Sequence, residues 1–331
     1  MIIFSDLHLS TKTRDVALEV LRRIPQECRR LGENHVAFLG DFFEVRHVIQ
    51  LALLIEARDI MSTWDEFGID LVDILPGNHD MFNIEGRNAL EVFDGIPGCR
   101  VHTHPTWTAD GLWIPFRHTQ QEIQEALELE RPGDEPPICF AHASVKGAMM
   151  NNHLANSDGI PDDMFKRAGF KRVFLGHYHK HQTVRKGMSY IGSPYQVTYG
   201  EAGQPKGFMT WDGKRAEFHE WSVGPKHHKL VIDADHPAEI QLPNVEDGDK
   251  LWVQVKGHMA GTMRDVVSAQ LKKSGLDVDR LEVDLQPTAY AGCLERQAGE
   301  DLDQLAHRFV DAQDADPAFK DMLHEAWRRL S

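Results

Sequence analysis

The first two-thirds of the chain alternate short apolar runs with longer segments in which apolar residues recur at helical spacing. A short apolar run bounded by polar or turn-forming residues is typical of a buried strand. Five such runs are predicted as strands, at MIIFS (1–5), HVAFL (35–39), DLVDIL (70–75), PPICFA (136–141) and KRVFL (171–175). Helices are predicted over 14–31 and 48–66. This alternation predicts an α/β sandwich with a mixed sheet.

The segments that follow alternate apolar and polar positions, as strands with one exposed face do. They are MSYIG (188–192), KGFMTW (206–211) and AEFHEW (216–221), and we expect them to be antiparallel. The turn-rich stretch 224–248 is interpreted as a linker, with the histidines of HHK (227–229) in solvent.

A small α+β domain is predicted after this linker. Its strands are KLWVQVKG (250–257) and DRLEVDLQ (279–286). Its helix begins at Thr262, with Asp265 at the capping-box position, and ends at Gly275. The chain is therefore divided into a first domain over 1–223, a linker and small domain over 224–300, and a tail over 301–331.

The tail is predicted to form two amphipathic helices, separated at Asp316-Pro317, a pair typical of a helix start. One apolar stripe comprises Leu302, Leu305, Ala306, Phe309 and Val310. The other comprises Phe319, Met322, Leu323, Ala326, Trp327 and Leu330. Such faces need apolar surface to cover them, supplied either by the small domain or by a partner.

The composition limits the partners of the protein and its location. With 36 Lys and Arg against 51 Asp and Glu, the 331-residue chain has a net charge of −15. This argues against a nonspecific basic coat for nucleic acid, although divalent cations and a local basic rim can still hold a polyanion. The absence of a long apolar run, the strand-like first residues and four widely spaced cysteines lead us to expect a cytoplasmic protein.

Each buried strand of the first domain is followed by side chains that can bind a metal. Because ligands gather beyond the carboxyl ends of strands in open α/β sheets, we expect these segments to meet in one crevice. The residues are Asp6, His8, Asp41, Asn78, His79, Asp80, His142, His177 and His179.

The spacing of these residues favours two metal ions. Residues two apart in extended backbone point to the same side, so Asp6 with His8, and His177 with His179, present paired ligands. Two cations about 3.5–4 Å apart also need a bridging carboxylate. Asp41 follows a glycine that permits close approach and is the candidate bridge. Mixed oxygen and imidazole ligands suit manganese, iron or zinc better than calcium. A lone histidine is more often structural, but five strand-end motifs would leave many buried polar groups unpaired without metal.

The motif order D-x-H, G-D, G-N-H-D, H and G-H-x-H resembles the calcineurin-like metallophosphoesterase superfamily. Within it, AHASVKGA (141–148) and YIGSPYQVTYGEAGQPKGF (190–208) are similar to the SbcD-type nuclease subunits. The resemblance implies a β-sandwich flanked by helices, a capping domain and C-terminal helices that dock on an SbcC-type coiled-coil ATPase. It also implies DNA as the substrate, manganese as the ion and a homodimer.

The resemblance also implies how the ligands divide between the ions. One ion would be held by Asp6, His8, Asp41 and His179, and the other by Asp41, Asn78, His142 and His177. His79 would protonate the leaving oxygen or stabilise the transition state. Glu44 is expected to orient His79 by accepting a hydrogen bond, although SbcD-like nucleases commonly have Asp or His there.

Two other functions are consistent with the same motifs. The first is a small-substrate phosphatase or cyclic-nucleotide phosphodiesterase. The protein-phosphatase signature G-D-x-x-D-R-G is missing, because Val45 stands at the arginine position. The second is a non-catalytic scaffold with a degenerate site, which the filled ligand positions disfavour. His102, His104 and His118 are interpreted as loop or edge residues.

Overall fold

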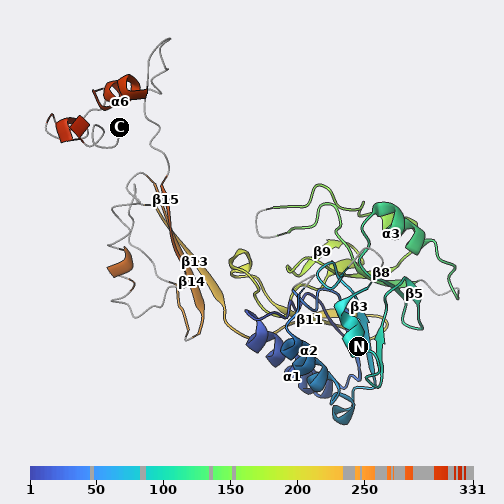
Figure 1. Ribbon diagram of the computed structural model, residues 1–331. Coiled ribbons are helices and arrows are strands. Elements are labelled where there is room, and N and C mark those ends of the chain that lie inside the picture. The colour runs from blue at the N-terminus through green and yellow to red at the C-terminus, as the bar shows by residue number, and fades with distance from the viewer. Residues whose placement is uncertain are drawn as a thin grey trace.

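The computed structural model describes residues 1–44, 48–82, 87–133, 137–150, 154–233, 243–246, 248–257, 267–269, 271, 280–285, 302–311, 317, 320–322, 324 and 325. Two six-stranded sheets form the larger part of the molecule (Figure 1). The first has the order β12-β11-β1-β2-β3-β4 and the second the order β5-β6-β7-β8-β10-β9.

The first sheet is parallel from β1 to β4, and β11 joins it antiparallel to β1. Its strands are β1 (Ile2–Phe4), β2 (His35–Leu39), β3 (Leu71–Leu75), β4 (Cys99–Val101), β11 (Gly207–Trp211) and β12 (Ala216–Glu220). The second sheet is parallel from β6 through β7 and β8 to β10. Its strands are β5 (Thr106–Trp107), β6 (Leu112–Ile114), β7 (Ile138–His142), β8 (Arg172–Gly176), β9 (Gln182–Arg185) and β10 (Met188–Tyr190).

The sheets pack face to face through a buried apolar layer. Ile3, Ala37 and Leu75 of the first sheet meet Phe140 and Phe174 of the second. On its other face, the first sheet is covered by α1 (Arg14–Leu31) and α2 (Leu51–Met61). The outer face of the second sheet packs against α3 (Gln120–Leu127) and α4 (Met164–Arg167). The structure therefore confirms the predicted α/β sandwich with mixed sheets.

Several local predictions are corrected. The second predicted helix is shorter, because α2 ends at Met61 and a separate 3-10 turn, η1, covers Asp65–Phe67. MSYIG forms β10, which is antiparallel to β9 but parallel to β8. Strands β4, β5, β6 and β9 were not predicted because runs of two to four residues carry too little periodicity. A short 3-10 segment, η2 (Ala89–Phe93), follows β3 and begins with a capping box at Asn88.

A third sheet contains β13 (His227–Asp233), β14 (Lys250–Gly257) and β15 (Arg280–Leu285), all parallel. Strand β13 lies inside the stretch interpreted as a linker, and His227 is buried rather than solvated. Val267 and Leu271, which are helical, pack on this sheet with Val253. The capping residues Thr262 and Asp265, and Gly275, lie outside the described residues, and the domain boundaries stay a prediction.

The third sheet contacts the larger part of the molecule through a 3-10 turn, η3 (Tyr199–Glu201). The ring of Tyr199 lies 4.8 Å from that of His227 and 5.8 Å from that of Trp252. The backbone N–H of His227 donates to the Gln196 side chain at 2.6 Å. Figure 1 shows β13–β15 extending away from the two large sheets.

In the tail, α6 (Leu302–Asp311) confirms the first predicted helix, and residues 317, 320–322, 324 and 325 are helical where the second was predicted. Nδ1 of His307 lies 2.6 Å from Nδ1 of His324, so the two segments contact each other. Much of both apolar stripes lies outside the described side chains. Within the described part of the chain, no helix combines the length and apolarity needed to cross a membrane.

Candidate metal centre

The backbone of the strand-end loops adopts an unusual conformation. Asp6 has φ 55°, His8 φ 49°, Asp41 φ 54° and His177 φ 108°. Among the described residues, these four are the non-glycine residues with positive φ. Such a conformation costs on the order of 1–3 kcal/mol per residue and persists where the surrounding structure enforces it. All four were predicted as metal ligands from the sequence.

The loops after β1 and β2 are joined by main-chain hydrogen bonds. Asp6 N–H donates to the Gly40 carbonyl at 3.0 Å, and His8 N–H donates to the Asp41 carbonyl at 2.9 Å. A Cβ at Gly77 would lie 2.1 Å from Oδ1 of Asp41, so only glycine permits the loop after β3 to approach this closely. The loops of β1, β2 and β3 therefore form one rigid rim at the carboxyl ends of the strands.

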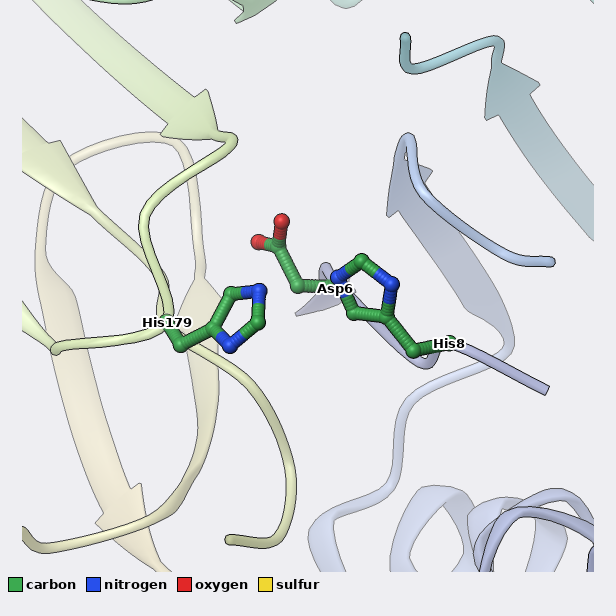
Figure 2. A group of neighbouring side chains, drawn as sticks. All are labelled: Asp6, His8 and His179. Carbon is green, nitrogen blue, oxygen red and sulfur yellow. The ribbon is translucent and has the colours of Figure 1, made fainter. Parts of the chain in front are cut away.

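Asp6, His8 and His179 form the first cluster of side chains. One potential ligand atom from each lies within 4.8 Å of the others. Figure 2 shows the three side chains facing one another, with Asp6 and His8 from the loop after β1 and His179 from the loop after β8. The rings of His8 and His179 are 4.6 Å apart.

The second cluster of side chains consists of Asp41, Asn78, His142 and His177. Nδ1 of His177 lies 3.3 Å from Nε2 of His142. Oδ1 of Asn78 lies 2.9 Å from Nδ1 of His177 and 3.1 Å from Nε2 of His142. Oδ2 of Asp41 lies 3.4 Å from Nε2 of His142. Four potential ligand atoms, three from loops and one from the last residue of β7, thus converge on a small volume.

Asp41 lies between the two clusters, where the sequence predicted a bridge. Its Oδ2 is 3.4 Å from Nε2 of His142 on one side and 3.8 Å from Nε2 of His8 on the other. Its Oδ1 accepts a hydrogen bond from the His79 N–H at 2.9 Å. The carboxylate is therefore fixed by the backbone and can serve both clusters.

The donor atoms fit divalent cations. His142 donates from Nδ1 to the Leu39 carbonyl at 2.7 Å, so in the neutral ring Nε2 presents a lone pair. That lone pair faces the amide oxygen of Asn78, and His8 Nε2 is buried with no hydrogen-bond partner in the described part of the chain. Buried lone pairs that face one another are costly unless a proton or a cation lies between them.

Burial and mutual proximity also shift the pKa values of Asp41, His142 and His177. Burial would raise the pKa of Asp41, but His142, then His8 and His79, hold it well below its usual value. Burial, reinforced by His142, lowers the pKa of His177 to about 3. Burial also lowers the pKa of His142, but Asp41 outweighs it and raises that pKa to about 9. The site thus contains an ionised carboxylate that attracts a positive charge, the attraction that a divalent cation would satisfy.

Asp80 does not join either cluster, although its motif follows a strand end. Its carboxylate accepts backbone hydrogen bonds from Gly77, Phe42 and Phe43 at 2.9, 3.2 and 2.8 Å. Burial and then the charge of Asp41 raise its pKa to about 7. Asp80 therefore clamps the loops after β2 and β3 together.

His79 and Glu44 lie at the edge of the first cluster. Nδ1 of His79 donates to the backbone carbonyl of Glu44 at 2.8 Å. The Glu44 carboxylate is 2.5 Å from Nδ1 of His8 but 4.0 Å from Nδ1 of His79. The hydrogen bond expected from His79 to the Glu44 side chain thus goes to its main chain, and the carboxylate contacts His8.

Two residues with a possible role at the site, Glu201 and Lys206, were not predicted from the sequence. The buried carboxylate of Glu201 accepts from Nδ1 of His179 at 2.8 Å and pairs with Lys206 at 2.6 Å. Lys206 also donates to the His179 carbonyl at 2.8 Å. Both residues lie in the segment 190–208 quoted above, but no spacing rule links them to a histidine some twenty positions earlier.

His102 was interpreted as a loop or edge residue, and it lies directly after β4, an edge strand of the first sheet, where its side chain is buried. It stacks on Trp113 with 4.9 Å between ring centroids and lies 2.6 Å from Asp73. Its role is structural, in the layer between the sheets.

Comparison with known proteins agrees with this geometry. A family model described as calcineurin-like phosphoesterase matches residues 1–181, more than half of the chain. Exonuclease subunit 1 of Enterobacteria phage T4 is 28% identical over 225 residues, which cover 64% of this chain and 65% of that protein. The match thus spans less than two-thirds of the relative. The matched family region contains every predicted metal ligand, and the protein belongs to the calcineurin-like phosphoesterase family, a family of phosphoester hydrolases.

Proposed function

We propose that the protein is a metal-dependent nuclease that hydrolyses DNA phosphodiester bonds with two divalent cations, for which manganese is the expected ion. The observation that supports this most is Asp41, which lies between two clusters of buried ligand atoms. Two adjacent cations that share a carboxylate are the arrangement that phosphoester cleavage uses in many enzymes.

The ligands divide as the geometry suggests. Asp6, His8, Asp41 and His179 would hold one cation. Asp41, Asn78, His142 and His177 would hold the other. When bound, the cations neutralise phosphoryl oxygens and lower the pKa of water to generate a nucleophile.

His79 is the proposed general acid. Its Nδ1 is occupied by the Glu44 carbonyl, so Nε2 is the atom left to give a proton to the leaving oxygen. Its ring lies 5.0 Å from that of His8, edge to face, beside the metal ligands. The main chain holds the ring in one orientation, as a positioned general acid requires.

A cavity of about 600 Å³ adjoins the second cluster and supports a nucleotide substrate. Asn78 and His177 line it, together with Phe116 and Arg117. This volume is in the range of sites that enclose a small organic ligand. The name of the phage relative, an exonuclease subunit, supports a nucleic acid as the polymer, and DNA is the nucleic acid that we propose.

The word subunit in that name also supports a partner. We place an SbcC-type coiled-coil ATPase on the C-terminal helices and expect a homodimer that acts in DNA end processing, repair or recombination. The cytoplasm is the proposed location, since the free thiols of Cys28, Cys99 and Cys139 suit a reducing compartment.

Hydrolysis assays with manganese test this function. The purified protein is offered linear duplex DNA, single-stranded DNA and bis(p-nitrophenyl) phosphate. We expect cleavage of DNA as well as of the small ester. Turnover of the small ester alone would identify a small-substrate phosphodiesterase, and inactivity on all three with metal bound would identify a scaffold.

A further inference from the structure

A second cavity, of about 740 Å³, lies at the opposite end of the second sheet from the metal centre. Gly111, Ile138, Arg172 and Met188 line it, at the amino ends of β6, β7, β8 and β10. The ligands His142 and His177 lie at or just after the carboxyl ends of β7 and β8. A five-residue strand therefore separates the two sites, a distance of about 17 Å.

The lining of this cavity is strongly basic. Seven Lys and Arg side chains contribute to it, against one carboxylate, Asp110. In the described part of the chain, five of the seven make no ion pair. These five are Lys166, Lys171, Arg172, Lys186 and Lys214.

This concentration of positive charge contrasts with the chain as a whole, whose net charge is −15. Unpaired cations of one sign around a hollow focus the field and attract a polyanion. Like charges that lie close together lower the stability of the folded protein. A cluster of cations without carboxylate partners is therefore better explained by the binding of an anionic ligand than by a contribution to folding stability.

Aromatic rings form part of the same wall. Trp107 and Phe170 stack with centroids 6.0 Å apart and planes inclined by 11°. The guanidinium of Arg172 lies over the ring of Trp211 at 5.5 Å. Cations around aromatic rings are the combination by which proteins hold single-stranded nucleic acid without reading its sequence.

We propose that this basic cavity, on the far side of the sandwich from the metals, binds a segment of single-stranded DNA. The choice of DNA among polyanions rests on the proposed nuclease function. The size of the cavity accommodates one or two nucleotides and not the cross-section of a duplex. Phosphates would contact the lysines, and a base would lie against the aromatic wall.

A strand held here would be bound far from the bond that is cut. Binding at two sites on one molecule raises the affinity for strands long enough to reach both. The cavity would therefore favour long single strands over short ones, which no feature of the metal centre itself provides.

The test uses the full-length protein and a fluorescein-labelled oligothymidylate of about twelve nucleotides, within the usual site size of such proteins. Binding is followed by fluorescence anisotropy in EDTA, so that neither metal binding nor cleavage contributes. The variant is Lys171→Glu/Lys214→Glu. The matched control is Arg22→Glu/Arg30→Glu, which makes the same charge change on α1. Melting curves establish that both variants are folded.

We expect the lysine variant to bind at least about tenfold more weakly than the wild type and the arginine control to bind like the wild type. The plot of log K against log salt should become shallower by about 1.4 for the lysine variant, since each single-strand phosphate contact contributes about 0.7. No binding by the wild type, or equal losses in both variants, would overturn the inference. Stronger displacement by oligoglutamate than by unlabelled oligothymidylate would also overturn it and assign the cavity to an acidic peptide.

Hydrolysis of bis(p-nitrophenyl) phosphate by the wild type with manganese is measured in parallel. That assay reports on the metal centre alone, so its failure would refute the proposed function and leave the lysine-dependent binding standing. Intact hydrolysis combined with lysine-independent binding would refute the second site and leave the proposed function standing.

Discussion

Nδ1 of His179 donates a hydrogen bond of 2.8 Å to the buried carboxylate of Glu201. The bond fixes the proton on Nδ1 and leaves Nε2 as the nitrogen available to a metal. Such partners of a metal ligand set its tautomer and its orientation. The Glu201–Lys206 pair therefore supports the first metal cluster by holding His179 in place, without itself supplying a metal ligand.

Replacing Glu201 by glutamine should weaken manganese binding. The amide removes the charge that orients His179 and leaves the buried Lys206 without a carboxylate, so affinity should fall by about 10- to 100-fold. Calorimetric titration with Mn²⁺ measures this, with Glu217→Gln, an exposed residue of β12, as the control. A lower melting temperature with unchanged metal affinity would contradict the positioning role.

His79→Ala should separate chemistry from metal binding. Loss of a general acid typically slows turnover by about 100- to 10,000-fold. Metal analysis should still find two ions per chain in this variant, whereas His142→Ala should lose one. If His79→Ala loses metal as well, His79 is a ligand and the proposed proton transfer is wrong.

Glu44→Gln should alter the first metal cluster rather than the general acid. Its carboxylate contacts His8, while His79 is held by the carbonyl, which the substitution keeps. Because Glu44 is partly exposed, we expect only about a tenfold loss of metal affinity, at the lower end of such effects. The pH dependence of kcat at saturating manganese should match that of the wild type, and a changed profile would show that the carboxylate acts on His79.

Asp73 should make the stability of the protein depend on pH. This buried carboxylate contacts His102 and His35 and pairs bidentately with Arg100. Burial would raise its pKa, but His102, His35 and Arg100 hold it well below the usual value. A lowered folded-state pKa contributes stability above the unfolded value of about 3.9, and this contribution is lost as the pH falls below it.

Urea unfolding of Asp73→Asn tests this. At pH 7 the variant should be less stable by about 3 kcal/mol, because the substitution breaks a buried charge cluster. The difference from the wild type should shrink as the pH decreases below about 4. A difference that stays constant with pH would show that packing, and not the charge, carries the effect.

Deletion of residues 301–331 should spare the metal centre, whose ligands all lie before residue 180. Turnover of bis(p-nitrophenyl) phosphate should therefore stay at the level of the full-length protein. Copurification with a coexpressed SbcC-type ATPase should be lost. Unchanged copurification would exclude the C-terminal helices as the docking site.

Sequence patterns predicted the architecture well where the apolar or periodic segments were long. Buried runs such as HVAFL and KRVFL identified their strands, and the rule that ligands follow strand ends brought Asp41 and His177 to one crevice. The prediction succeeded because the carboxyl ends of neighbouring parallel strands lie at one edge of each sheet. The two edges also meet, since Asp41 after β2 lies 3.4 Å from His142 of β7.

The misses have physical reasons as well. Strand β13 begins with His227, His228 and Lys229, whose polarity is typical of a linker, and only its pairing with β14 makes it a strand. Contacts such as Glu201 with His179 arise from the path of the chain and follow no periodicity. The left-handed backbone of Asp6 and His8 is likewise tied to tertiary contacts, because their N–H groups donate hydrogen bonds to a neighbouring loop.

The turn η3 contacts the third sheet and the metal centre at the same time. At one end Tyr199 contacts His227 and Trp252 of the third sheet, and at the other Glu201 holds His179. Because three consecutive residues carry both sets of contacts, we expect a tilt of the third sheet to shift His179 as well. We therefore expect a macromolecule that exerts force on the C-terminal half to move His179, one ligand of the metal centre.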